Sequence, residues 1–154
     1  MQSCHAGLHA ISGNGGSTNY RSMSVAGSIL LSKGMKVAVS VYSQKDLSYT
    51  ISSESGWGCH YMKQQIGFHA DAKANQGLKK GWNLVSQWED RSSVNSELYN
   101  LGGSIASNGY YHAPQTGYYA CSAQIRLDSA DKTSYFRLLL ALNGDRDINQ
   151  GTVR

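Results

Sequence analysis

The side chains that could carry out catalysis are spread along the chain without the spacing that an active site needs. His5 and His9 are four residues apart, but no Glu lies between them as in an H-E-x-x-H zinc site, and no helical pattern surrounds them. The serines lack the G-x-S-x-G context of an activated nucleophile. The ten carboxylates form no recognisable acid–base pair. We therefore expect a protein that is not an enzyme.

Calcium is the one cofactor that the sequence brings into consideration. Asp145, Asp147 and Asn149 alternate as do the oxygen ligands in the first half of a calcium-binding loop. Gln150 stands where an EF-hand loop has glycine, and no distal glutamate follows. A solvated polar turn is the alternative for this segment. The glycine-rich residues 13–19 lack the lysine of a phosphate-binding loop, so we expect a surface loop there.

The cysteines are Cys4, Cys59 and Cys121, an odd number, so at least one is free or pairs between chains. No C-x-x-C spacing is present, which argues against a zinc site. We expect buried free thiols in strands, with one disulfide plus one free thiol as the alternative.

Composition favours a single compact β domain over the other common classes. The chain has 154 residues, 17 glycines and only 16% charged residues. Its net charge of +4 comes from scattered lysines and arginines rather than from a basic stripe, so nucleic acid is not an expected partner. No apolar run reaches the roughly 18 residues that span a membrane, and no signal peptide is visible at the N-terminus. Insertion into a membrane is therefore not expected.

Short alternating segments predict an all-β fold with antiparallel strands. In residues 36–43, Val37, Val39 and Val41 face one side, which predicts a half-buried strand that follows a turn at Lys33-Gly34. Similar segments with turn signals between them predict a sandwich or jelly roll of about ten strands. These further segments lie at 47–55, 56–62, 81–88, 102–113, 117–127 and 134–145. Most of the ten tyrosines should fill the core or a subunit interface, and the exposed ones are candidates for ligand contact.

One segment resembles a known family. Residues 110–127, "YYHAPQTGYYACSAQIRL", are similar to the signature of the C1q globular head domain in the C1q/TNF superfamily, with Tyr111, Pro114, Gly117 and Tyr119 at matching positions. Cys121 and Ala123 stand where the family has aromatic residues. Pro114 and Gly117 are expected to form the turn that precedes a strand with Tyr119, Cys121 and Ile125 on its inward face. The resemblance implies an antiparallel jelly-roll sandwich.

The resemblance extends over nearly the whole chain, but with the two halves of the domain exchanged. Residues 1–62 resemble the family's second half, and residues 66–154 resemble its first half. We expect one circularly permuted domain over residues 1–154, because the family's first and last strands are antiparallel neighbours. The linker Lys63-Gln64-Gln65 should then form a hairpin between them. A fragment of a tandem array and an exchange of halves between two chains are the alternatives.

The resemblance also implies a function. Members of the family are secreted, non-enzymatic modules that assemble as trimers and bind proteins or carbohydrates. We therefore expect an extracellular recognition module that forms a homotrimer, with a structural trimerisation domain for attached segments as the alternative. The most plausible binding loops are residues 43–48, 13–19 and 128–133. Within and beside them the candidate ligand-binding residues are Gln44, Lys45, Asp46, Asn14, Asn19, Tyr20, Asp131 and Lys132.

Overall fold

The protein is described by a computed structural model over residues 20–44, 46, 50–63, 66–90, 100–101, 108–128 and 136–143. These residues form β-strands and no helix, and therefore contain no helix that could cross a membrane. The strands are β1 (Tyr20–Leu31), β2 (Lys36–Ser43), β3 (Thr50–Ile51), β4 (Gly56–Tyr61), β5 (Gly67–Ala72), β6 (Gln76–Gly77), β7 (Gly81–Leu84), β8 (Trp88–Asp90), β9 (Asn100–Leu101), β10 (Tyr111–His112), β11 (Gly117–Asp128) and β12 (Phe136–Leu142). The all-β prediction is confirmed for this part of the chain.

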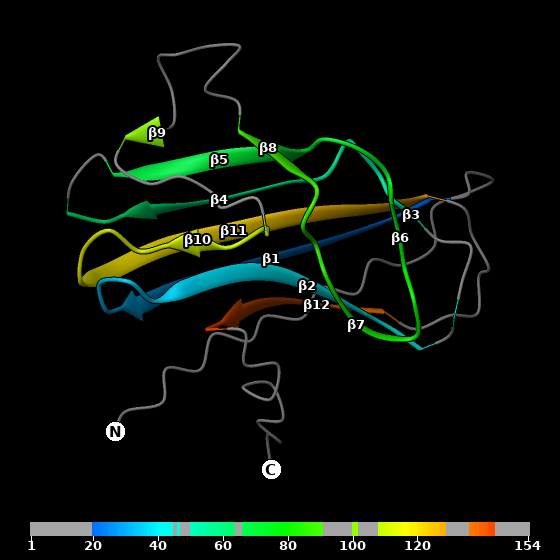
Figure 1. Ribbon diagram of the computed structural model, residues 1–154, viewed down its shortest axis with the longest axis horizontal. Helices are drawn as coiled ribbons and strands as arrows, with labels where there is room; N and C mark the ends of the chain where they lie inside the picture. The colour runs from blue at the N-terminus through cyan, green and yellow to red at the C-terminus, as the bar shows by residue number, and fades with distance from the viewer. Residues whose placement is uncertain are drawn as a thin grey trace.

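The larger of two sheets has eight strands and is built around β11. One edge of β11 pairs along its whole length with β1, from Tyr20 opposite Asp128 to Leu31 opposite Gly117. Its other edge pairs with β4 and, further along, with β3. Beyond β4 follow β5 and β8, so β1, β11, β4 and β5 run side by side (Figure 1). Every pairing in this sheet is antiparallel.

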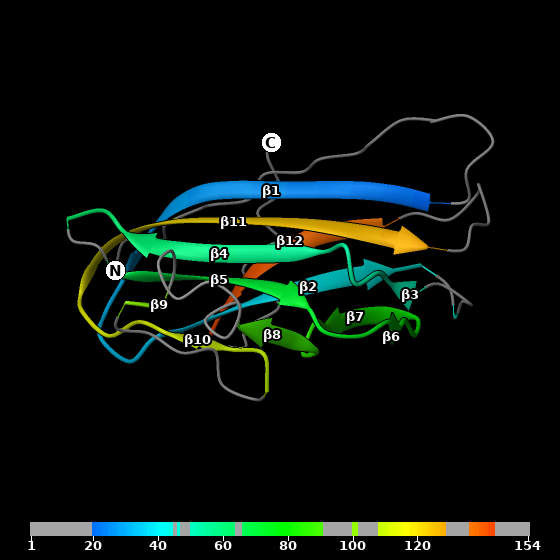
Figure 2. The same cartoon turned by 90° about the horizontal axis from the view of Figure 1, so that it is seen from above.

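The smaller sheet has four strands, with β2 paired to β12, β10 and β7. It lies against the larger sheet (Figures 1 and 2). The inward residues of both sheets form one hydrophobic core, to which β1 contributes Val25 and Ile29, β2 contributes Val39, and β12 contributes Leu138 and Leu140. Each such side chain stabilises the fold by roughly 1.5–3 kcal/mol through its removal from water.

An aromatic row fills the core beside the larger sheet. The rings of Trp57 and Phe68 have centroids 4.6 Å apart, and those of Phe68 and Tyr111 are 4.4 Å apart. Tyr119 continues the row, with its centroid 5.2 Å from that of Tyr61. The inward face predicted for Tyr119, Cys121 and Ile125 is confirmed, since all three side chains are buried. Aromatic pairs at these spacings add about 0.5–1.5 kcal/mol each beyond their burial.

Two predictions about burial and bonding were wrong. Cys59 and Cys121 are joined by a disulfide, as the alternative of one disulfide allowed, whereas buried free thiols were the first expectation. They lie directly opposite each other on β4 and β11, a relationship that depends on strand pairing and is invisible in their separation of 62 residues. Strand β2 was expected to be half-buried, but Ala38 and Ser40 on its second face are as buried as the valines. The alternating pattern could not reveal this, because both faces of a strand at the centre of a sheet can be covered.

The predicted turns are present, and the strands of the predicted hairpin are paired. Gly34 has φ +84°, and the Met35 amide donates to the Ser32 carbonyl 2.9 Å away, which closes the turn between β1 and β2. Pro114 lies between β10 and β11, where the second turn was expected. Strands β4 and β5 are antiparallel neighbours, with His60 opposite Gly67, as the hairpin expected at the linker Lys63-Gln64-Gln65 requires; residues 64 and 65 themselves lie outside the described residues.

Candidate functional site

Residues that border all three predicted binding loops lie together at one end of the sandwich. Tyr20, which follows the segment 13–19, pairs with Asp128, where the third loop begins. Ser43, at the start of the first loop, pairs with Phe136 in the other sheet. The guanidinium of Arg21 lies 5.9 Å from the centroid of the Phe136 ring and links the two sheets there. We call this region, at the right-hand end of Figure 1, the loop end.

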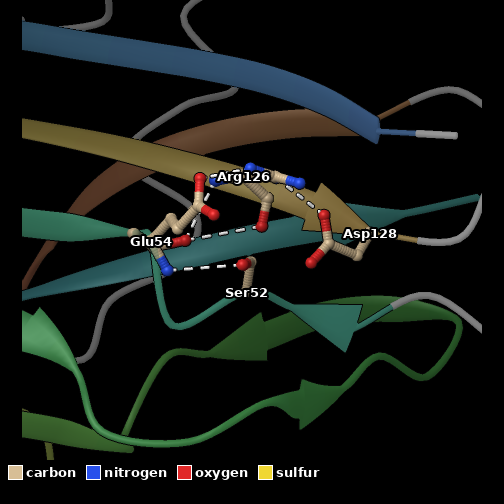
Figure 3. A network of polar contacts seen from close by, with 5 residues as sticks. Ser52, Glu54, Arg126 and Asp128 are labelled. Carbon is tan, nitrogen blue, oxygen red and sulfur yellow. Dashed lines mark hydrogen bonds and ion pairs between the residues drawn. The ribbon is translucent and has the colours of Figure 1, made fainter. Parts of the chain in front are cut away.

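Arg126 is the centre of a polar network on the outer surface of the loop end. Its Nε donates to Asp128 Oδ1 over 2.8 Å, and its Nη1 forms an ion pair with Glu54 Oε2 (Figure 3). The guanidinium carbon also lies 4.5 Å from the centroid of the Tyr20 ring, which is a cation–π distance. The arginine is therefore held from three sides, by two carboxylates and one aromatic face.

The backbone beside Arg126 is fixed as firmly as its side chain. The Arg126 amide donates to Ser55 Oγ over 2.9 Å, and the Ser52 amide donates to the Arg126 carbonyl over 2.8 Å. Ser52 Oγ in turn accepts from the Glu54 amide at 3.3 Å. These bonds form where β3 gives way to β4 beside the end of β11. The short segment that carries Glu54 is thus tied to the same strand as its arginine partner.

Hydrogen bonds favour the charged form of Arg126. The bond that Arg126 donates to Asp128, and secondarily the one that it donates to Glu54, raise the pKa of Arg126 above its ordinary value. One guanidinium and two carboxylates leave a net charge of −1 for the three groups. All three side chains are partly open to solvent, with Glu54 67% exposed, so the ion pairs contribute little to folding stability. The network therefore fixes orientation more than it adds stability.

Among the predicted ligand-binding residues, Tyr20, Gln44 and Asp46 fall within the described residues, and all three are exposed. Asp46 Oδ1 accepts from the Lys80 amide at 2.7 Å, which attaches the first loop to the start of β7. Tyr20 contacts Arg126, as described above. The other predicted residues lie outside the described residues, namely Lys45, Asn14, Asn19, Asp131 and Lys132.

The calcium prediction also falls outside the described residues, because Asp145, Asp147 and Asn149 all belong to residues 144–154. Within the described ranges, no group of three or more His, Cys, Asp or Glu side chains is placed to hold a metal ion. Calcium binding by the segment 145–149 therefore stays a prediction.

Comparisons with protein-family models, with curated proteins and with solved structures found no match. The site must therefore be interpreted from its own geometry. A positioned arginine beside a half-exposed tyrosine suits contact with a ligand, since Arg and Tyr are among the residue types that most often dominate binding interfaces.

Sequence reasoning missed Arg126 and Glu54. A signal for Arg126 was present, because Gln124, Arg126 and Asp128 alternate with the buried Ile125 and Leu127 and must face outward at the end of a strand. Glu54 carried no such signal. Its proximity to Arg126 depends on the pairing of β3 and β4 with β11, which joins segments 72 residues apart.

Proposed function

We propose that this protein is a non-enzymatic recognition module that binds a protein or carbohydrate ligand through the loop end and works as a homotrimer outside the cell. The observation that carries the proposal is that Tyr20, Ser43 and Asp128, which border the three predicted binding loops, lie at the same end of the sandwich as Arg126. Loops that a rigid β scaffold brings together are the usual place for binding residues. The resemblance of residues 1–62 to the second half and of residues 66–154 to the first half of a C1q-like domain supports a permuted jelly roll as the scaffold.

The hairpin between β4 and β5 supports the permutation. In the C1q-like domain the first and last strands are antiparallel neighbours. Here β4 ends the segment that resembles the family's second half, and β5 begins the segment that resembles its first half. These two strands are antiparallel partners from Gly56 opposite Asp71 to His60 opposite Gly67. A short connection between such neighbours is the join that a permuted domain requires.

The disulfide supports an extracellular location. Disulfides form and persist in oxidising compartments, and they are rare in the cytosol, where thiols are kept reduced. The Cys59–Cys121 bond lies in the core with both cysteines almost fully buried, so it belongs to the folded framework of the domain. A secreted recognition module has both the environment and the need for such a bond.

The experiment that tests the proposal is a combined glycan and extracellular-protein array probed with the full chain. We expect reproducible binding to at least one ligand class, and binding should weaken when Arg126 is replaced. An array that stays silent for both classes, at a protein concentration of about 10 µM, contradicts the proposed recognition of a ligand with micromolar or tighter affinity, which corresponds to a binding free energy of about −8 kcal/mol or more negative.

A structural trimerisation domain is the second candidate, and one surface favours it. Leu30, Met62 and Tyr118 are 42%, 58% and 55% exposed on the larger sheet, at the end remote from the loop end. They are neighbours, since Leu30 pairs with Tyr118, and the Met62 amide donates to the Tyr118 carbonyl. Exposed apolar groups that lie together are typical of subunit contacts. Light scattering tests this role. The unmodified protein should be a trimer, and the Tyr118→Ser variant should dissociate. The array should then show no ligand.

A further inference from the structure

The outer face of the larger sheet contains a hollow that lies apart from the loop end. Its volume is about 550 Å³, within the range of small-molecule sites. Strands β1, β11, β4 and β5 contribute its lining, which includes Ser28, Ser122, His60 and His69. The buried disulfide lies directly beneath, because Cys59 and Cys121 also border it.

The hollow exists because small residues occupy the centre of this face. Ala26 and Ser28 on β1 and Ala120 and Ser122 on β11 form paired rows. Gly58 completes the floor on β4, opposite Ser122. A methyl group at Gly58 would lie 2.5 Å from the Phe68 carbonyl oxygen, so the β4–β5 pairing itself excludes a larger residue there. The depression is therefore a fixed feature of the sheet.

The polar groups that line the hollow are hydroxyl groups and imidazole rings. Ser28 and Ser122 offer hydroxyl groups on its floor and one wall, and His60 and His69 rise from the opposite wall on β4 and β5. His69 Nε2 lies 3.3 Å from Asp71 Oδ1 at the edge. No lysine or arginine lines the hollow. Hydroxyl and imidazole groups both donate and accept hydrogen bonds, which is the pattern that the hydroxyl groups of a sugar require.

An exposed aromatic ring, that of Tyr118, lies on the same face of the larger sheet, outside the lining of the hollow. Tyr118 precedes Ala120 by two residues on β11, so both side chains lie on the same face of the strand. The side chain of Tyr118 is 55% exposed. An exposed aromatic ring presents a flat apolar surface beside a polar end. The C–H face of a pyranose ring can lie on such a surface while its hydroxyl groups reach the hollow.

We propose that this hollow binds a neutral saccharide. Ser28, Ser122, His60 and His69 would bind its hydroxyl groups, and the Tyr118 ring would cover its C–H face. No lysine or arginine is among the described residues that line the hollow, so it offers no permanently cationic side chain to anionic sugars and phosphates. This inference rests on the proposed recognition function and adds to it a second site, remote from the loop end, and its ligand class.

The test titrates glucose, galactose, mannose and N-acetylglucosamine, one at a time, into the isotopically labelled full chain, with sialic acid and inorganic sulfate as charged comparators. Amide signals are followed by NMR up to about 20 mM, because a single sugar ring binds with millimolar affinity. At least one neutral sugar should shift the amides of His60, His69 and Ser122 in a saturable manner. The two comparators should leave these signals in place.

Two matched variants decide whether the hollow is the site. Ser28→Tyr fills the hollow, whereas Ser24→Tyr places the same side chain on the same exposed face of β1, opposite Gln124 and outside the lining. Tyrosine is well tolerated in strands, so both variants should fold. Ser28→Tyr should weaken the sugar's affinity at least about tenfold, and Ser24→Tyr should change it less than about twofold.

Other results of these experiments would overturn one of the two proposals. Equal affinity in the two variants, or shifts confined to the loop end, would overturn the assignment of the hollow. Saturable shifts with sialic acid or sulfate alone would overturn the ligand class. If no neutral sugar binds while the array yields a protein ligand, the hollow proposal fails and the recognition function stands. If the hollow binds a sugar while the array is silent, the hollow proposal stands and the loop end loses its function.

Discussion

Cys59 lies directly opposite Cys121 across β4 and β11, and the disulfide between them closes a loop of 62 residues through the centre of the core. A crosslink of this kind stabilises a fold mainly by restricting the unfolded chain. We predict that the double variant Cys59→Ala, Cys121→Ala lowers the free energy of unfolding by about 3 kcal/mol in urea denaturation. Unchanged stability would show that the bond does not constrain the chain.

The bond itself can be mapped by mass spectrometry of tryptic peptides without reductant. Cleavage after Lys45, Lys63, Arg91 and Arg126 leaves Cys59 and Cys121 on two separate peptides. These should be recovered as one linked species that separates on reduction. Recovery of either cysteine linked to Cys4 would contradict the pairing seen here.

Gly117 is required by the ring of Tyr61. A methyl group at Gly117 would overlap the Tyr61 ring and lie 2.9 Å from its hydroxyl oxygen, and this hydroxyl group donates to the Thr116 carbonyl at 3.4 Å. We predict that Gly117→Ala lowers the free energy of unfolding by about 2 kcal/mol, since the ring must move. Gly81→Ala is the matched control, because Gly81 also has a positive φ, +95°, and nothing lies within 4 Å of its added methyl group. Equal losses in both variants would exclude the contact as the cause.

Tyr111 and Tyr119 are both fully buried but differ in their hydroxyl groups. Tyr119 Oη donates to the Gln115 carbonyl at 2.8 Å, whereas Tyr111 Oη has no hydrogen-bond partner among the described residues. Tyr119→Phe should therefore cost about 1 kcal/mol, and Tyr111→Phe should leave stability unchanged or raise it by up to about 1 kcal/mol. Thermal or urea denaturation measures both. A larger loss for Tyr111→Phe than for Tyr119→Phe would mean that Tyr111 has a polar partner after all.

The same tyrosines predict how stability changes at alkaline pH. Burial, and secondarily the neighbouring Tyr119, raise the pKa of Tyr111 above its ordinary value of 10.0, and burial also raises that of Tyr119. Near pH 10 the hydroxyl groups of these two tyrosines therefore lose their protons in the unfolded chain but not in the folded chain. The free energy of unfolding should hold up to about pH 10 and fall above it, by up to about 1.4 kcal/mol per pH unit for each tyrosine. Tyr111→Phe should make this fall shallower, and an unchanged slope would contradict the raised pKa.

The alternating segments predicted most of the strands, because burial on one face is a local property of the sequence. The inward face of β11 and the turn at Gly34 were readable in this way, whereas the neighbouring positions of β4 and β5 were expected from the family resemblance. The disulfide, the burial of Ala38 and Ser40, and the contact between Glu54 and Arg126 were not. Each depends on which strands pair and what covers them, and the spacing of residues along one strand does not determine either.

The same distinction, between local sequence patterns and strand pairing, applies to the residues of the candidate sites. Loop positions follow from turn residues, so Gln44, Asp46 and Tyr20 could be named in advance. The hollow between β1, β11, β4 and β5 could not, because its floor of Gly, Ala and Ser becomes a depression only when four strands from distant segments lie side by side. Small residues in one strand do not predict a hollow unless the neighbouring strands are also known.

Recognition through the loop end is tested most directly by comparing two variants against the ligand that the array identifies. Arg126→Ala removes the centre of the polar network, whereas Lys33→Ala removes an equal charge from the turn at the other end of the sandwich. Isothermal titration calorimetry should show at least about tenfold weaker binding for Arg126→Ala, as for a residue that dominates an interface. Lys33→Ala should bind as the unmodified protein does. Equal affinity of the two variants for the ligand would contradict the loop end as the binding site.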